Sequence, residues 1–211
     1  MIYHYLNLVC LDAVSPHCSE HETYYCDSIS LLFLARLFGK KLCYRPGTVV
    51  ARNFHCQMTN EKILWLTSSP DIIISAGHVE VLPHFEESFE EFCTANKILL
   101  SSFETIIIGI SSPKQNELAR EILLCLGERP NKLKDIHCLG AAVDPDISFR
   151  SSHLSGTGIQ WVEFLSKSPT RTLQKIVITL KECASICLLY QKRKSFLSQL
   201  KKFEEKTHEQ K

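Results

Sequence analysis

The 211-residue chain contains 45% hydrophobic residues, enough to bury one sizeable core, and its net charge of +1 argues against a dedicated nucleic-acid binder. The charge is unevenly spread, because residues 1–166 hold 13 Lys and Arg against 19 Asp and Glu, whereas residues 167–211 hold 11 against 4. We therefore predict two parts, a domain over residues 1–166 and a basic tail over residues 167–211 whose partner is anionic.

The cysteine pattern and the N-terminus bear on the compartment. The ten cysteines are irregularly spaced, and "MIYHYLNLVC" lacks the basic start of a signal peptide and is soon interrupted by polar residues. We therefore expect reduced thiols and a cytoplasmic protein. No uninterrupted apolar stretch reaches the roughly 20 residues that a membrane-spanning helix needs, so we expect no such helix.

The predicted elements alternate along the chain. Residues 27–41, "DSISLLFLARLFGKK", have helical spacing and end on a glycine flanked by lysines, as helix ends prefer. A second helix is predicted over residues 83–97, where three phenylalanines recur at helical spacing, and a third over residues 114–128. Short apolar runs that end on small residues predict strands at 62–69, 104–112 and 136–144.

This alternation predicts an α/β fold, a Rossmann-like parallel sheet flanked by helices, followed by a C-terminal helical appendage. In such sheets ligands bind at the carboxyl ends of the strands. One predicted strand ends in "GISS" and leads to Pro113 at the first turn of a helix, which would expose backbone N–H groups suited to a phosphate or a sugar. Taken alone, the segment fits a routine strand-to-helix loop better, since single loop motifs recur by chance.

The segment "GISSPKQNELA" resembles the Gly-x-x-x-Pro-Lys-Gln-Glu motif of the bacterial WecG/TagA/CpsF glycosyltransferase family, the N-acetylmannosaminyltransferases that build enterobacterial common antigen and wall teichoic acid linkage units. Three further segments resemble this family in the same order: "YCDSISLLFLARLFGKKLCYRPGT", "CLGAAVDPDISFRSS" and "GIQWVEFLSKSPTR". Together the four segments span residues 24–171, which is more specific than any one motif. The matching positions outside the first motif are Asp27, Arg36, Gly39, Arg45, Gly47, Asp144, Arg150, Gly158, Trp161, Pro169 and Arg171.

The resemblance implies an inverting transfer of N-acetylmannosamine, or a related N-acetylhexosamine, from a UDP-sugar donor to a lipid-linked N-acetylglucosamine acceptor, with no required metal and no other cofactor. A sugar hydroxyl is a poor nucleophile at neutral pH, so a carboxylate within hydrogen-bond reach is the natural general base. Asp27 matches the family's carboxylate and is our candidate for the catalytic base. Its alternative role is that of a helix N-cap, which aspartate also favours.

Charged and amide side chains would hold the donor and stabilise the charge that develops on the departing UDP. The resemblance assigns arginines to the diphosphate, an amide to the sugar or diphosphate, a lysine as added positive charge, and an aspartate that orients the pocket or contacts the nucleotide. Each arginine could instead be a solvated surface residue, the usual state of a single charged side chain. These substrate-binding candidates are Arg45, Lys114, Gln115, Asp144, Arg150 and Arg171.

Several positions depart from the family pattern. The glutamate after Gln115 is replaced by Asn116, and two arginines expected towards the C-terminus are replaced by Phe164 and Gln174. Loss of one preorganised charge contact typically costs about two to three orders of magnitude in rate. The alternative hypothesis is therefore a diverged, non-catalytic protein that binds a sugar nucleotide or serves as a scaffold.

The tail combines apolar residues at helical spacing with a basic cluster at Lys192, Arg193 and Lys194. A basic amphipathic helix can lie in the headgroup layer of an anionic membrane, and the resemblance implies a peripheral location at the inner face of the cell membrane. A helix packed on the domain and a self-association surface that makes a homo-oligomer are the alternatives, because an amphipathic stripe serves all three.

A competing site is suggested by "HCSEHETYYC", whose potential zinc ligands are His17, Cys18, His21 and Cys26. Their spacing fits no familiar structural zinc site and the second half of a paired motif is missing, so we expect a loop with incidental cysteines and no metal. Cys183 and Cys187 are expected to be buried thiols on an apolar helix face.

Overall fold

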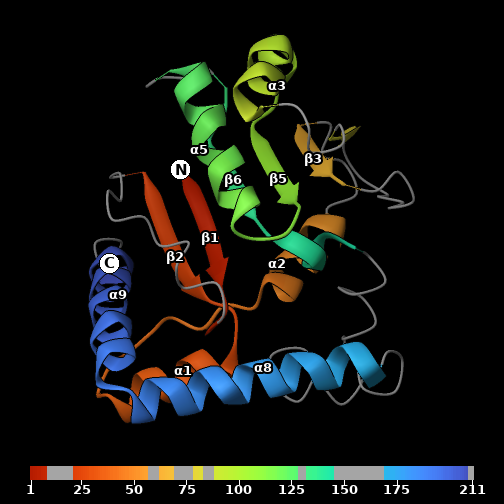
Figure 1. The fold of residues 1–211 in the computed structure, drawn as a ribbon. Coiled ribbons are helices and arrows are strands. Elements are labelled where there is room, and N and C mark those ends of the chain that lie inside the picture. Colours follow the sequence, from red (N-terminus) through yellow and green to blue (C-terminus); the bar gives the residue numbers. More distant parts are fainter. Residues whose placement is uncertain are drawn as a thin grey trace. The chain divides into compact units, whose positions relative to one another are not determined.

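The computed structural model describes residues 1–8, 21–56, 62–68, 78–82, 88–127, 132–144 and 169–208 (Figure 1). The chain divides into two compact units. Unit 1 comprises Met1–His4 and Gly47–Arg150, and unit 2 comprises Tyr5–Pro46 and Ser151–Lys211. The predicted boundary between residues 166 and 167 lies outside the described residues, so it stays a prediction.

The strands form a six-stranded parallel sheet in the order β2-β1-β6-β5-β3-β4. This confirms the predicted α/β fold with a parallel sheet, flanking helices and C-terminal helices. The three predicted strands correspond to β3, β5 and β6, and the structure adds β1, β2 and β4 to them. The bounds are Ile2–Leu6 for β1, Glu22–Cys26 for β2, Ile63–Thr67 for β3, His78–Val81 for β4, Thr105–Gly109 for β5 and Asp135–Cys138 for β6.

One face of the unit 1 strands packs against three helices, α3 (Phe89–Ala95), α4 (Lys97–Ser102) and α5 (Lys114–Leu126). Alternate side chains of neighbouring strands, such as Leu64 and Ile106, point into this core because successive strand residues face opposite ways. The third predicted helix is confirmed by α5. The second begins at Phe89 with Ser88 as its N-cap, and the predicted residues 83–87 lie outside the described part of the chain.

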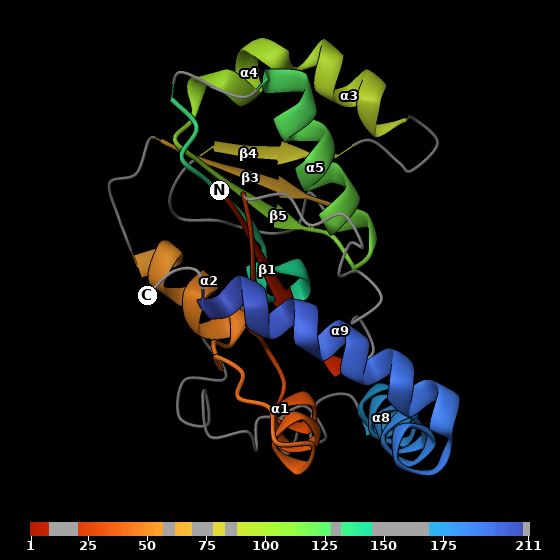
Figure 2. The same ribbon diagram turned by 90° about the vertical axis from the view of Figure 1, so that its left-hand side faces the viewer.

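The other face of these strands is covered by α2 (Gly47–Cys56), and Figure 2 shows α2 on the side of β3 and β5 opposite to α3, α4 and α5. His55 of α2 stacks on Trp65 of β3 with ring centroids 4.6 Å apart, and Phe54 meets the ring of His137 edge-on at 4.9 Å. These aromatic contacts bury large surfaces in preferred geometries, so they fix α2 against the sheet.

Unit 2 has its own core, in which α1 (Ile29–Leu37) and α9 (Tyr190–His208) bury apolar residues with β2. Tyr24 of β2 and Phe203 of α9 have ring centroids 6.0 Å apart, and both are fully buried. The first predicted helix is thus confirmed. Its N-cap is Ser28, whose hydroxyl accepts from the Leu31 N–H at 3.3 Å, so the alternative role of Asp27 as the cap is wrong.

The tail consists of two helices rather than one, because α8 (Pro169–Leu188) ends just before α9 begins. In α9 the buried residues Phe196, Leu200 and Phe203 belong to the core of unit 2, as the packing alternative predicts. In α8 most apolar residues are exposed, and Cys187 is exposed too, so the expectation of a buried thiol there is wrong. Within the described residues, no helix is long and apolar enough to cross a membrane.

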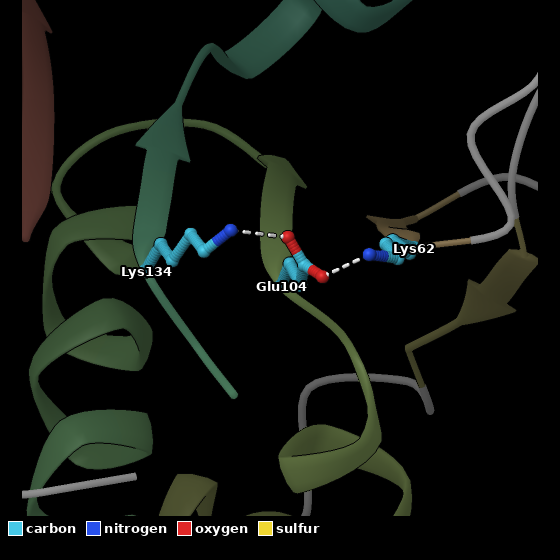
Figure 3. A network of polar contacts seen from close by, with 3 residues as sticks. All are labelled: Lys62, Glu104 and Lys134. Atoms are coloured by element: carbon cyan, nitrogen blue, oxygen red, sulfur yellow. Dashed lines mark hydrogen bonds and ion pairs between the residues drawn. The ribbon is translucent and has the colours of Figure 1, made fainter. Parts of the chain in front are cut away.

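An ion-pair network connects residues that directly precede three neighbouring strands of unit 1 (Figure 3). The carboxylate of Glu104, which precedes β5, contacts Lys62 before β3 and Lys134 before β6, the latter at 2.6 Å. Hydrogen bonds from the two lysines lower the pKa of Glu104 to about 2. This network lies at the amino ends of the strands, so the carboxyl ends are left for a ligand site.

Candidate functional site

In unit 1 the loop from β5 to α5 carries the candidate Gln115. The Gln115 side chain is 4% exposed, and its carbonyl oxygen Oε1 has no hydrogen-bond partner among the described residues. Gly140 lies beside it with a φ of +56°, and a Cβ atom at Gly140 would stand 3.5 Å from both this oxygen and the Ile110 carbonyl oxygen. At the carboxyl ends of β5 and β6 there is therefore a buried amide whose acceptor oxygen has no donor among the described residues.

The backbone at the start of α5 is less available than the sequence predicts. The Gln115 N–H donates to the Ser111 carbonyl at 3.3 Å, and the Asn116 N–H donates to the Pro113 carbonyl at 2.9 Å. Pro113, the N-cap residue, already has helical dihedral angles, so the helical turn begins one residue before α5. Both N–H groups therefore bond to backbone carbonyls of this turn. These two N–H groups are therefore already paired, and the expectation that backbone N–H groups of this loop bind a phosphate or sugar stays a prediction for the others.

Asn116, the residue that departs from the family pattern, is buried in a polar chain. Its amide Nδ2 donates to His4 Nδ1 at 2.6 Å, and its Oδ1 accepts from the Ser112 hydroxyl at 3.1 Å. Both His4 and Asn116 are almost completely buried. Because buried polar groups are costly unless they are hydrogen-bonded, this chain fixes the start of α5, and with it Gln115, relative to β1.

The turn after β6 is held by His55. Its ring nitrogen Nε2 lies 2.9 Å from the Val143 carbonyl oxygen, and since a carbonyl only accepts, Nε2 carries the hydrogen. Burial lowers the pKa of His55, although the Val143 carbonyl and the charge of Asp144 oppose this effect. The neutral imidazole thus anchors the short 3-10 helix Gly140–Val143 (η2), which leads from Gly140 beside Gln115 to Asp144.

In unit 2 two candidates lie beside one another at the carboxyl end of β2. Cys26 forms a parallel bridge with Tyr44, and the Arg45 N–H donates to the Cys26 carbonyl at 2.9 Å. One residue further along both segments come Asp27 and Arg45, which are therefore neighbours on one face. The Arg45 guanidinium lies 5.0 Å from the ring centroid of Tyr25, two residues before Asp27 on the same face.

The pKa values of Tyr44 and Cys26 describe the surroundings of the Asp27 carboxylate. Burial raises the pKa of Tyr44, and the negative charge of Asp27 raises it further, which places the phenol within electrostatic reach of Asp27. Burial also raises the pKa of the Cys26 thiol to about 12, so this cysteine is protonated at neutral pH. His17 and Cys18 lie outside the described residues, within which no group of three or more His, Cys, Asp or Glu side chains could hold a metal.

The structure thus divides the sequence-predicted candidates into two sets. Unit 1 brings Gln115 together with the turn that leads to Asp144, and Lys114 is exposed beside them. Unit 2 brings Asp27 and Arg45 together. Arg150 and the side chain of Arg171 lie outside the described part of the chain, so their roles stay predictions.

Sequence reasoning missed four residues that support these two sets. They contact residues that are distant in the sequence or belong to an isolated β-bridge, so no local sequence pattern identifies them. They are His4, Tyr25, Tyr44 and His55.

Comparisons with known proteins add no relative: no family model matches the chain, and no curated protein or solved structure matches it.

Proposed function

We propose that this protein is an inverting glycosyltransferase that moves N-acetylmannosamine, or a related N-acetylhexosamine, from a UDP-sugar to a lipid-linked N-acetylglucosamine in bacterial surface polysaccharide biosynthesis. The observation that carries the proposal is the buried Gln115 amide, whose carbonyl oxygen has no donor among the described residues. It lies where strand carboxyl ends bind ligands, in the segment with the most specific family resemblance.

The proposed donor site depends on the free-energy cost of burying the Gln115 carbonyl oxygen without a hydrogen-bond donor. A buried acceptor without a donor costs about 1–3 kcal/mol, and native structures keep such groups mainly where a ligand, water or functional role compensates. A sugar hydroxyl or an acetamido N–H has the required donor. Lys114 is exposed next to Gln115 and adds positive charge for a diphosphate.

The acceptor side is assigned to Asp27. Its carboxylate takes the proton of the acceptor hydroxyl while the hydroxyl oxygen attacks the anomeric carbon. The bond between that carbon and the diphosphate oxygen breaks, and UDP leaves with the bonding electron pair. Arg45, next to Asp27 in the strand register, carries a guanidinium that the ring of Tyr25 helps to orient.

A lipid-linked acceptor requires access to a membrane, so we place the protein at the inner face of the cell membrane. The basic cluster Lys192, Arg193 and Lys194 lies in the first turn of α9, where all three residues are exposed. Lys192 pairs with Glu182 at 3.1 Å, which reduces its share of the attraction to anionic lipid. The neighbouring helix α8 contributes exposed apolar side chains, including Leu173, Val177 and Leu180.

The transferase proposal is tested by UDP release from a panel of UDP-N-acetylhexosamines, with and without a lipid-linked N-acetylglucosamine. We expect acceptor-dependent UDP release with at least one donor, and release that is about 10²–10⁴-fold slower from Asp27→Asn. Measurable UDP binding without turnover with any donor would support the non-catalytic alternative, which the replacements at Phe164 and Gln174 favour. Absence of both binding and turnover would overturn the proposal.

The membrane location is tested by replacing Lys192, Arg193 and Lys194 with glutamine. At about 1 kcal/mol per basic residue, partitioning to anionic vesicles at low salt should fall by roughly two orders of magnitude, and raised salt should have the same effect. A control variant removes basic charge from unit 1 at the exposed residues Lys97 and Lys132, which take no part in the Glu104 network. Truncation of α9 is a poorer test, because it removes the core residues Phe196, Leu200 and Phe203.

A further inference from the structure

The helix α1 exposes three large apolar side chains on one side. Ile29, Phe33 and Leu37 are 40%, 65% and 59% exposed, and their spacing of four residues places them in one row, here called the α1 ridge. A surface helix normally carries polar residues on its solvent side. In α1 the remaining exposed residue is Arg36, so the solvent side is mainly apolar.

The ridge continues into a basic hollow at the C-terminal end of α1. Arg36, Lys40 and Lys41 line this hollow together with Gly39 and Leu42. The N–H groups of Phe38, Gly39 and Lys40 donate to carbonyls of α1, so attraction for an anion comes from the side chains. Lys40 is held in place by Glu204 of α9, with its ammonium 2.8 Å from the carboxylate.

Basic residues outnumber acidic ones beside the ridge, where Glu204 pairs with Lys40 and leaves Arg36 and the Lys41 side chain for an anion. Residues 28–60 contain four basic residues before Pro46 and no Asp or Glu. A second copy of the chain is a poor occupant, because a two-fold contact would bring the same cations of both copies together. The ridge is apolar and the hollow beside it is basic, so a matching partner has an apolar interior below a negatively charged surface. The headgroup layer of an anionic bilayer is such a partner.

Other exposed apolar residues of unit 2 lie on the adjacent helix. The helices α1 and α8 pack together and run side by side in both views (Figures 1 and 2). Leu173, Val177 and Leu180 of α8 are spaced by four and three residues, so they form an exposed apolar row of their own. The apolar exposure of unit 2 is therefore not limited to one helix.

We propose that α1 docks on an anionic membrane, with the α1 ridge inserted into the headgroup layer and Arg36, Lys40 and Lys41 against lipid phosphates. Asp27 immediately precedes the N-cap of α1, so this docking sets the candidate base at the depth of a membrane-bound hydroxyl. The docking needs no catalytic activity, whereas this consequence for Asp27 rests on the proposed function.

Insertion is tested with tryptophan as a depth reporter. Phe33→Trp is compared with Ile98→Trp, which places the indole at an 87% exposed position of α4 in unit 1. The vesicles contain phosphatidylcholine and phosphatidylglycerol with brominated acyl chains. We expect a blue shift and bromine quenching for Phe33→Trp only. Equal responses of the two variants, or no response of Phe33→Trp, would overturn the proposal.

Affinity is tested by sedimentation with the same vesicles without bromine. Phe33→Gln with Leu37→Gln should weaken partitioning by more than about tenfold, because the transfer of two apolar side chains is lost. The control, Ile98→Gln with Leu124→Gln, changes even more exposed apolar residues of unit 1 and should leave partitioning unchanged. Equal losses in both double variants would show that the ridge has no special role. Circular dichroism checks that each variant is folded.

Two further arms separate the remaining outcomes. In lipid-free solution, sedimentation equilibrium should give the same mass for the native chain and for the ridge variant, and a dimer that the variant abolishes would overturn the membrane assignment in favour of self-association. None of these assays contains a sugar nucleotide, so their result is independent of the transferase proposal. Acceptor-dependent UDP release with a water-soluble acceptor should in turn be unaffected by the ridge variant.

Discussion

The two units differ in which side chains depart from the usual burial pattern, although unit 2 also buries Glu22 and Thr23 and unit 1 also exposes Ile98 and Leu124. Unit 1 buries the polar side chains of His4, His55, Gln115 and Asn116 among apolar neighbours. Unit 2 exposes large apolar side chains on α1 and α8 and surrounds them with basic residues. Buried polar groups that are held by hydrogen bonds specify one rigid geometry, whereas exposed apolar groups are stabilised only when a partner covers them. The ligand site proposed for unit 1 depends on the first of these features, and the docking surface proposed for unit 2 depends on the second.

The largest expected effect separates the chemical roles of the two units. Asp27→Asn in unit 2 should lower the turnover number by about 10²–10⁴-fold, the usual contribution of a general base, with UDP affinity nearly unchanged. Gln115→Ala in unit 1 should instead weaken binding of the UDP-sugar, measured by calorimetry. If Asp27→Asn reduces UDP affinity as much as the rate, both residues serve the donor and the division is wrong. Thermal melting establishes that both variants are folded.

The next effect concerns the rigidity of unit 1. A Cβ atom at Gly109 would lie 3.0 Å from Val143 Cβ and Cγ2, so the end of β5 and the turn before Asp144 have no room for a side chain. Gly109→Ala should lower the free energy of unfolding by about 1–3 kcal/mol, the range for overpacked sites. Val143→Ala in the same chain should return part of this loss, and urea unfolding of the four combinations measures the coupling. Additive losses would show that the contact is not restrictive.

A smaller effect tests the neutral His55. Because its folded pKa lies below 6.5, the unfolded chain binds more protons in acid. The contribution of His55 is therefore fully present above pH 6.5 and is lost as the pH falls from 6.5 through the folded pKa. Within that window the slope is at most about 1.4 kcal/mol per pH unit. Unfolding of the native chain and of His55→Gln between these limits should show a shallower slope in the variant. Identical slopes would contradict a buried neutral imidazole.

The smallest effect lies at the amino ends of the unit 1 strands. The pKa of Glu104 is about 2 in the folded chain, below its usual 4.5, so its ion pairs stabilise the fold above pH 4.5 and lose this effect as the pH falls towards 2. The two lysines are exposed and Glu104 is partly exposed, so salt screens the pairs and the change in melting temperature should be slight. Glu104→Gln should remove that part of the acid dependence. A large destabilisation at neutral pH would mean that the network is structural.

The elements that the sequence predicts well have strong local patterns. In α5, apolar residues recur at helical spacing over 13 residues, and β5 is a continuous apolar run bounded by polar residues. The strands β2 and β4 lack such a pattern: β2 reads "ETYYC" with a buried glutamate, and β4 has only four residues. They are strands because neighbouring segments pair with them, which is a tertiary effect on weak local propensity.

By itself the sequence determined the parallel α/β class, the positions of α1 and α5, and the basic tail. Periodicity and side-chain chemistry are local properties, so they can be read along the chain. Only the tertiary structure decided that Arg45 lies beside Asp27, that His55 holds the Val143 carbonyl 88 residues away, and that the α1 ridge stays uncovered by the described residues. These contacts and exposures depend on which distant segments meet, and that is set by packing in three dimensions rather than by any repeat in the chain.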